Sequence, residues 1–222
     1  MTACTPGRTG QCAGVQSGFF ITLEGGEGVG KSTQLRRIAE HLTARGREVL
    51  ATREPGGSQG AEAIRALLVS GAADRWSPLS ETLLLYAARS DHLERTIRPA
   101  LARGAVVISD RFSDSTRAYQ GAAGGVDPAF ILEVERQVLG DTRPDLTLIL
   151  DLPAEIGLER AARRGAAEAR FESKGLVFHQ RLRDGFLALA HAEHGRCRVI
   201  DAARSVDEVT ASILTVLDEA LG

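Results

Sequence analysis

Residues 25–32 read GGEGVGKS, which places Gly25, Gly30, Lys31 and Ser32 in the register GxxxxGK[ST]. Glycines at these positions let successive backbone N–H groups turn inward around phosphate oxygens. The lysine then reaches the β and γ phosphates, and the hydroxyl that follows it binds Mg²⁺. This stretch therefore predicts a loop that holds the phosphates of a nucleoside triphosphate.

The residues on either side of the loop have the pattern that the motif requires. Residues 19–24 form a short apolar run of β-forming residues, and Ser32 to Arg45 has helical periodicity. A strand, a loop and a helix in this order are the expected context of a phosphate-binding loop. The N-terminus of the helix would add its partial positive charge. We expect Lys31 to be exposed in the loop.

Length and composition indicate one α/β domain at residues 19–222, preceded by a mobile N-terminal tail at residues 1–18. The net charge of −2 and the apolar content of 43% do not indicate a nucleic-acid or membrane-surface protein. We expect a small-molecule ligand. The tail lacks the apolar centre of a secretion signal, and the three cysteines form no CxxC pair, so we expect a cytoplasmic protein.

Short β-type runs alternate with helical stretches along the whole chain. The five predicted strands are residues 19–23, 48–52, 105–109, 146–151 and 198–200. Near-continuous apolar runs such as residues 105–108 are typical of strands that are buried on both faces. The pattern predicts an α/β fold in three layers, with a five-stranded parallel sheet and helices on both faces.

Ligands of such sheets bind beyond the carboxyl ends of the strands, so the residues that follow each strand carry the most weight. Asp110 directly follows the third predicted strand, where its carboxylate could orient water around Mg²⁺. A helix N-cap or a salt bridge to Arg111 is the alternative. The planar guanidinium of Arg111 suits a second phosphate. Glu27 lies inside the loop, where a carboxylate needs a hydroxyl or a cation as its partner.

Three further stretches have weaker patterns. Residues 121–125 are rich in glycine and predict a loop between helices. Four arginines around Gly165, within residues 160–175, suit a mobile cover that brings Arg170 to the phosphates, although an exposed helix and turn would have the same composition. His191 and His194 could share a helix face, but they lack a third ligand and predict a solvated pair.

Taken in order, six stretches resemble the thymidylate kinase family. They are GGEGVGKST (25–33), TREPGG (52–57), YAAR (86–89), DRF (110–112), STRAYQG (115–121) and RPDLTLILDL (143–152). The resemblance extends over residues 19–220. It implies a P-loop NTPase-type fold and transfer of the γ phosphate of ATP to dTMP, with Mg²⁺ as cofactor and usually in a homodimer.

The resemblance also implies roles for individual residues. The loop residues that would bind ATP are Gly25, Gly26, Glu27, Gly28, Val29, Gly30, Lys31, Ser32 and Thr33. Ser32 and Asp110 would serve the Mg²⁺ site, and Arg111 would clamp the dTMP phosphate. Glu27 would approach the deoxyribose 3′-hydroxyl. Catalysis would rest on Lys31, Arg170, Asp110 and Arg111. Some members of the family have a catalytic arginine in the phosphate loop and others have it in the cover. Because Gly28 in the loop carries no charge, the resemblance implies that Arg170 in the cover has this role.

The remaining residues implied by the resemblance would recognise the acceptor nucleotide. They are Arg53, Pro55, Arg65, Leu85, Arg89, Thr116, Tyr119 and Gln120. Arg89 would contact the thymine edge, although a surface salt bridge would also explain an arginine there. Turn chemistry would equally account for Arg53 and Pro55, an exposed helix face for Arg65 and core packing for Tyr119.

Leu85 departs from the family pattern, which often has Phe four residues before the YAAR arginine. Stacking of a base on an aromatic ring is worth on the order of 1–3 kcal/mol, so an aliphatic contact implies weaker acceptor affinity or looser base choice. Two other functions would use the same loop: another nucleoside monophosphate or deoxynucleoside kinase, and a nucleotide-dependent switch. The sequence contains no guanine-selecting NKxD motif, which argues against the switch.

Overall fold

The computed structural model describes residues 18–72, 74–163 and 174–222. Within them, five parallel strands form one sheet in the order β2-β3-β1-β4-β5. Their bounds are β1 Phe19–Glu24, β2 Val49–Arg53, β3 Val106–Asp110, β4 Leu146–Asp151 and β5 Cys197–Asp201. The predicted five-stranded parallel sheet is confirmed. No strand end differs from its predicted position by more than one residue.

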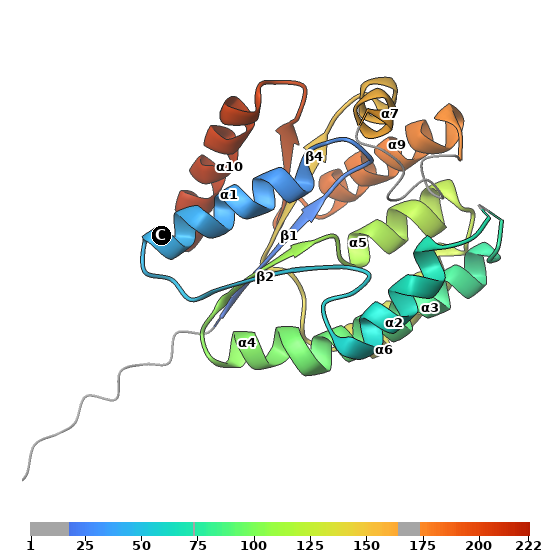
Figure 1. Ribbon diagram of the computed structural model, residues 1–222, viewed down its shortest axis with the longest axis horizontal. Helices are drawn as coiled ribbons and strands as arrows, with labels where there is room; N and C mark the ends of the chain where they lie inside the picture. Colours follow the sequence, from blue (N-terminus) through green and yellow to red (C-terminus); the bar gives the residue numbers. More distant parts are fainter. Residues whose placement is uncertain (1–17, 73, 164–173) are drawn as a thin grey trace, which may run out of the picture.

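Helices cover both faces of the sheet (Figure 1). Helices α1 (Lys31–Ala44) and α10 (Val206–Leu221) lie together on one face. On the other face lie α2 (Gln59–Val69), α3 (Pro78–His92), η1 (Leu93–Ile97), α4 (Arg98–Ala102), α5 (Ser113–Thr116), η2 (Arg117–Ala123), α6 (Pro128–Leu139) and α9 (Leu176–Ala192). Helix α7 (Ala154–Ala162) follows β4. The three predicted layers are therefore present.

Successive side chains of the inner strands alternate between two hydrophobic cores. In β1, Ile21 and Leu23 pack with Ile38 of α1 and Ile213 of α10 in the first core. Phe20 points to the opposite face, into a second core with residues of α3, η1, α4 and α6. All of these side chains are almost completely buried. The period of two in a strand thus explains why a continuous apolar run fills both sides of the sheet.

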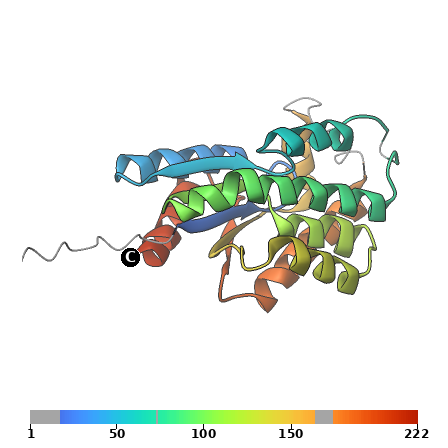
Figure 2. The same ribbon diagram turned by 90° about the horizontal axis from the view of Figure 1, so that it is seen from below.

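Helices α3, η1 and α4 continue into one another as a single rod along the sheet (Figure 2). The middle segment, Leu93–Ile97, is a π-helix. Pro99 follows it, and a proline ring clashes with the carbonyl group four residues earlier in a regular α-helix. The wider turn accommodates this proline without ending the rod.

A second π-helix, η2, corrects the prediction of a loop at residues 121–125. Gly121 lies inside η2, which ends at Ala123, so only the last part of the glycine-rich stretch is a connection. A side chain on Gly121 would come within 3.1 Å of Ile131 Cδ1, so this glycine is explained by close helix packing.

The parallel register brings the strand ends to a common edge. Asp110 pairs with Leu23 of β1 and with Arg53 of β2, so the loops that follow these strands begin at the same level. The candidate site is built at this edge. Across the described ranges, the structure holds no helix with the length and apolar character that a bilayer span requires.

Candidate active site

The loop between β1 and α1 has a backbone that requires glycine at several positions. Gly25, Gly28 and Gly30 have φ angles of 130°, 69° and 93°, a region that other residues rarely adopt. A Cβ atom on Gly28 would also lie 2.0 Å from the carbonyl oxygen of Gly157 in α7. The uncharged Gly28 is therefore needed for close packing between this loop and α7.

Lys31 and Ser32 begin helix α1 at the open side of the loop. Lys31 Nζ donates to the carbonyl oxygens of Gly26 at 2.8 Å and Gly25 at 3.2 Å. The expectation that Lys31 is exposed is wrong: its side chain is buried, because the ammonium group folds back onto the loop. Burial, followed by the charge of Arg111, lowers the Lys31 pKa. The two carbonyl oxygens thus occupy the place beside the ammonium group that a phosphate oxygen would occupy.

Ser32 and Asp110 meet although they are far apart in the sequence. Ser32 Oγ donates to Asp110 Oδ2 at 2.8 Å. Asp110 is not a helix N-cap, because α5 begins at Ser113 and Phe112 is the residue before it. Mg²⁺ is usually held by one or two protein oxygens together with phosphates and water. The pair therefore fits a magnesium ion, although among the described residues no group of three or more acidic, His or Cys side chains could form a metal cage.

Arg111 has a backbone conformation that is unusual for a residue with a side chain. Its φ angle is 71°, and Ser109 Oγ donates to its carbonyl oxygen at 2.7 Å. The guanidinium donates to Gly25 O at 2.9 Å and to Glu27 Oε1 at 3.0 Å. It also lies 4.8 Å from the centre of the Tyr119 ring. The strained backbone thus directs the fork of Arg111 toward the phosphate-binding loop.

Glu27 has the cationic and hydroxyl partners that its position in the loop requires. Tyr119 Oη donates to Glu27 Oε1 at 2.6 Å, the same oxygen that Arg111 contacts. Burial opposes the charge, but Arg111, Lys31 and Tyr119 together lower the Glu27 pKa to about 2. Glu27 is therefore a stable anion, fixed between the loop and η2.

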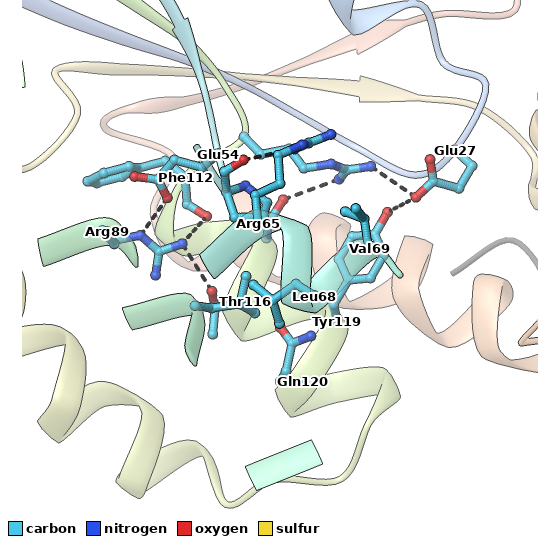
Figure 3. A pocket seen from close by; sticks show the side chains of 14 residues that line it. Glu27, Glu54, Arg65, Leu68, Val69, Arg89, Phe112, Thr116, Tyr119 and Gln120 are labelled. Atoms are coloured by element: carbon cyan, nitrogen blue, oxygen red, sulfur yellow. Dashed lines mark hydrogen bonds and ion pairs between the residues drawn. The ribbon is translucent and has the colours of Figure 1, made fainter. Parts of the chain in front are cut away.

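An open pocket with an empty volume of about 560 Å³ lies next to Glu27 and Arg111 (Figure 3). Nine of the residues that line the pocket are site residues predicted from the family resemblance: Glu27, Pro55, Arg65, Leu85, Arg89, Arg111, Thr116, Tyr119 and Gln120. Those that were not predicted are Glu54, Leu68, Val69, Phe112 and Ser115. The structure therefore gathers residues from the loop after β1, the segment after β2, α2, α3 and the segment after β3 around one cavity.

Arg89 extends into this pocket from α3 and is 2% exposed. Its Nε donates to Glu54 Oε2 at 2.7 Å, and its Nη2 donates to Phe112 O and Thr116 Oγ1, each at 3.1 Å. The third nitrogen, Nη1, has no hydrogen-bond partner in the described part of the chain. The salt bridge of Arg89 is thus buried and not on the surface, and it leaves one donor for a ligand.

Gln120 is the second buried polar group of the pocket with an unused atom. Its Nε2 donates to Glu81 Oε2 at 2.9 Å, whereas its Oε1 accepts no hydrogen bond from the residues that the structure describes. Gln120 is 2% exposed and lines the same cavity as Arg89. Buried polar atoms are rarely left without a partner. A free donor and a free acceptor in one pocket indicate a ligand with a complementary edge.

The weaker acceptor-site candidates have different positions. Arg65 Nη1 donates to Pro55 O at 2.8 Å, and both residues line the pocket. Leu85 lines it with Leu68, in keeping with an aliphatic contact. Arg53 is not among the lining residues, and its side chain is exposed and paired with Glu62 at 3.2 Å. Arg170 and most of the expected cover lie outside the described residues.

Sequence reasoning missed the buried carboxylates of Glu54, which lines the pocket, and of Glu24. Glu54 lies inside the TREPGG stretch and binds both Arg89 and His92, with a distance of 3.1 Å to His92 Nδ1. Glu24, the last residue of β1, accepts from Phe112 N at 2.8 Å and from Ser115 Oγ at 2.5 Å. Burial and then Asp114 raise the Glu24 pKa to about 8. An acidic residue at the end of an apolar strand was the signal that could have identified Glu24.

Comparisons with known proteins identify relatives of this chain. The family model described as thymidylate kinase matches residues 23–213. The chain is 65% identical to the thymidylate kinase of Caulobacter vibrioides over 92% of this chain and 98% of that protein. It is 54% identical to the thymidylate kinase of Dinoroseobacter shibae, over 91% and 97% of the two chains.

A solved structure has the same architecture. The crystal structure of thymidylate kinase from Ehrlichia chaffeensis superimposes with a TM-score of 0.75 at 33% sequence identity. The match covers 90% of this chain and 99% of that one. With a family model over most of its length and relatives of more than 50% identity, this chain belongs to the thymidylate kinase family.

Proposed function

We propose that this protein transfers the γ phosphate of ATP to dTMP and releases dTDP and ADP. Membership of the thymidylate kinase family supports the reaction. The observation that carries the proposal is the cavity beside the phosphate-binding loop, which has phosphate-binding groups at one end and unused polar atoms of Arg89 and Gln120 at the other. A nucleoside monophosphate has the same polarity from phosphate to base.

At the phosphate end, Lys31 and Arg111 supply the charges for the reaction. Lys31 would exchange its contacts with loop carbonyls for the ATP phosphates, and Arg111 would bind the phosphate of dTMP. Phosphoryl transfer depends on alignment and charge neutralisation, so no protein nucleophile is required. Glu27, held by Arg111 and Tyr119, would accept a hydrogen bond from the sugar hydroxyl.

At the base end, the two unused atoms match the edge of thymine. Arg89 Nη1 is a donor, which suits the 4-carbonyl oxygen, and Gln120 Oε1 is an acceptor, which suits N3–H. Cytosine presents an amino group and an unprotonated ring nitrogen at these positions, the reverse pattern. A mismatch would leave both buried groups without partners, and such sites discriminate strongly. Leu85 and Phe112 would contact the faces of the base.

We propose Ser32 and Asp110 as the residues that hold Mg²⁺. The hydroxyl and carboxylate oxygens, 2.8 Å apart beside Lys31, suit a hard cation that shares its coordination with phosphates. When bound, Mg²⁺ neutralises charge on the transferred phosphate. Chelation by EDTA is expected to abolish transfer, and addition of Mg²⁺ to restore it.

We also propose a cytoplasmic homodimer. Helix α3 exposes Leu79 and Leu83, one turn apart, and the neighbouring α6 exposes Leu132, each with about half of its surface accessible. A set of exposed leucines on adjoining helices is typical of a subunit interface. Light scattering is expected to give twice the chain mass, and a Leu83→Glu variant to give the monomer mass. A wild-type monomer would contradict the proposal.

The acceptor preference tests the proposed reaction. ATP and Mg²⁺ are supplied with dTMP, dUMP, dCMP, AMP or GMP in turn, and ADP release is measured. We expect dTMP to have the highest kcat/KM. Preference for another monophosphate would assign the protein to a different nucleotide kinase activity, and release of ADP at the same rate without any acceptor would indicate a nucleotide-hydrolysing switch.

A further inference from the structure

Gln120 is held from behind by a carboxylate that does not belong to the pocket lining. Glu81, in the first turns of α3, is 2% exposed, and its Oε2 accepts the hydrogen bond from Gln120 Nε2 at 2.9 Å. Gln120 Oε1, on the other branch of the same amide, is buried, lines the pocket and has no partner within the described ranges. Figure 3 shows this amide at the end of the cavity that also contains Arg89 and Thr116.

The two ends of a glutamine amide are nearly equal in size but opposite in hydrogen bonding. One end has two N–H donors and the other has a carbonyl acceptor. Shape alone therefore does not decide which end faces a ligand, and the partner on the far side must decide it. An ionised carboxylate has only acceptors, so it stabilises one of the two orientations.

The oxygen of Glu81 that accepts from Gln120 also faces a second donor. Lys174 Nζ lies 3.8 Å from Glu81 Oε2, the same oxygen that accepts from Gln120. An ammonium group has donors only, so the carboxylate of Glu81 is the acceptor for both neighbours. Gln120 therefore directs its NH₂ group toward Glu81 and its carbonyl oxygen toward the pocket.

We propose that Glu81 is a positioning residue that sets base specificity by fixing the amide orientation of Gln120. This inference rests on the proposed function, because it assumes that the pocket receives a pyrimidine monophosphate. With the carbonyl oxygen facing the pocket, the site accepts a base that carries N3–H and opposes one that presents an acceptor there. Glu81 itself does not touch the substrate in this scheme.

The contribution of Glu81 is separate from that of Arg89. Arg89 is held by Glu54, Phe112 O and Thr116, whereas the amide of Gln120 is held by Glu81. A guanidinium has no acceptor and cannot be inverted, so it continues to favour a 4-carbonyl group whatever happens at residue 81. Loss of the carboxylate is therefore expected to relax base choice in part and not to abolish it.

A Glu81→Gln variant tests the proposal, because glutamine has nearly the same shape as glutamate but offers both a donor and an acceptor. The two substrates to compare are dTMP and 5-methyl-dCMP, which differ only in the 4-substituent and the protonation of N3. We expect the ratio of their kcat/KM values to fall at least about tenfold in the variant, as for relief of one buried hydrogen-bond mismatch. The ratio of dTMP to dUMP should stay unchanged, since these bases share the same edge.

Glu81→Asp is the matched control, because aspartate keeps a carboxylate that only accepts. It should retain the ratio of dTMP to 5-methyl-dCMP even if the shorter side chain lowers both rates. Thermal unfolding of both variants identifies any loss of fold, and if Glu81→Gln does not fold, an unchanged base ratio in Gln120→Leu would overturn the proposal by itself. Gln120→Leu removes the acceptor that faces the base and should lower the ratio sharply if the fixed amide orientation sets base choice.

The outcomes separate this inference from the proposed function. Equal loss of activity toward dTMP, dUMP and 5-methyl-dCMP in Glu81→Gln would show a purely structural role and overturn the inference. An unchanged ratio would overturn it as well, while the thymidylate kinase activity of the wild-type protein stands. If the wild-type protein has no preference for dTMP, the proposed function itself fails.

Discussion

Replacement of Glu54 by alanine is expected to destabilise the protein and to weaken dTMP binding together. Glu54 Oε2 accepts from Arg89 Nε at 2.7 Å, and Glu54 Oε1 lies 3.1 Å from His92 Nδ1. His92 Nε2 in turn lies 2.8 Å from Thr52 Oγ1. The side chains of Glu54, Arg89 and His92 are 4%, 2% and 0% exposed. The alanine variant leaves the charge of Arg89 buried without its anion.

The size of this effect follows from the burial of the pair. Removal of one partner from a buried ion pair costs about 3–5 kcal/mol, because the remaining charge is not solvated. A domain of this size has a free energy of unfolding of roughly 5–15 kcal/mol. The corresponding decrease in Tm is roughly 6–20 °C at about 2–4 °C per kcal/mol. The KM for dTMP should rise, since Arg89 Nη1 loses its fixed direction.

Urea unfolding and steady-state kinetics measure the two effects. Glu133→Ala is the matched control, because the Glu133–Arg136 pair has a similar distance of 2.7 Å but is 59% and 63% exposed. It should change neither stability nor KM appreciably. In a double-mutant cycle, Glu54→Ala should be much less harmful when Arg89 is already methionine. If Glu54→Ala is as mild as Glu133→Ala, or if the two changes are additive, the reasoning is refuted.

Two other predictions concern charged groups near the loop. Lys31→Ala is expected to lower kcat roughly 10²–10³-fold, as for the loss of one group that stabilises transition-state charge. Circular dichroism should show that the variant keeps its native fold. Near-normal turnover in a folded variant would contradict the role proposed for Lys31. Glu24, with its pKa raised from 4.5 to about 8 by burial and Asp114, binds a proton in the folded state that the unfolded chain has released. The free energy of unfolding should therefore fall as the pH rises through this window, by at most about 1.4 kcal/mol per pH unit. Urea unfolding from pH 5 to 8 should show a flatter profile for Glu24→Gln, and identical profiles would contradict the shift.

The parallel sheet could be predicted from local patterns because the phosphate-loop motif and the apolar runs were unambiguous. The phosphate-loop motif lies between β1 and α1, and the apolar runs at residues 105–108 and 146–150 became β3 and β4. Buried parallel strands need long apolar runs, and short loops after them need glycine. The glycine-rich stretch at residues 121–125 was partly wrong, since packing against Ile131 and not loop geometry explains Gly121.

The residues that support the site were harder to predict. Glu54 and Glu81 are charged residues in polar stretches, where the usual expectation is exposure to solvent. Their burial depends on partners distant in sequence, Arg89 for Glu54 and Gln120 for Glu81. Lys31 was expected to be exposed for the same reason, yet the folded loop provides carbonyl oxygens that bury it. Motifs identified most of the residues that line the pocket, and only three-dimensional contacts identified the buried carboxylates that hold them.

The destination of the γ phosphate tests the central claim most directly. ATP labelled with ³²P in the γ phosphate is incubated with the protein, Mg²⁺ and dTMP, and the products are separated by chromatography. We predict that the label appears in dTDP and that its transfer requires dTMP. Label that appears only in inorganic phosphate, at a rate independent of dTMP, would contradict the assignment of this pocket as the acceptor site of a thymidylate kinase.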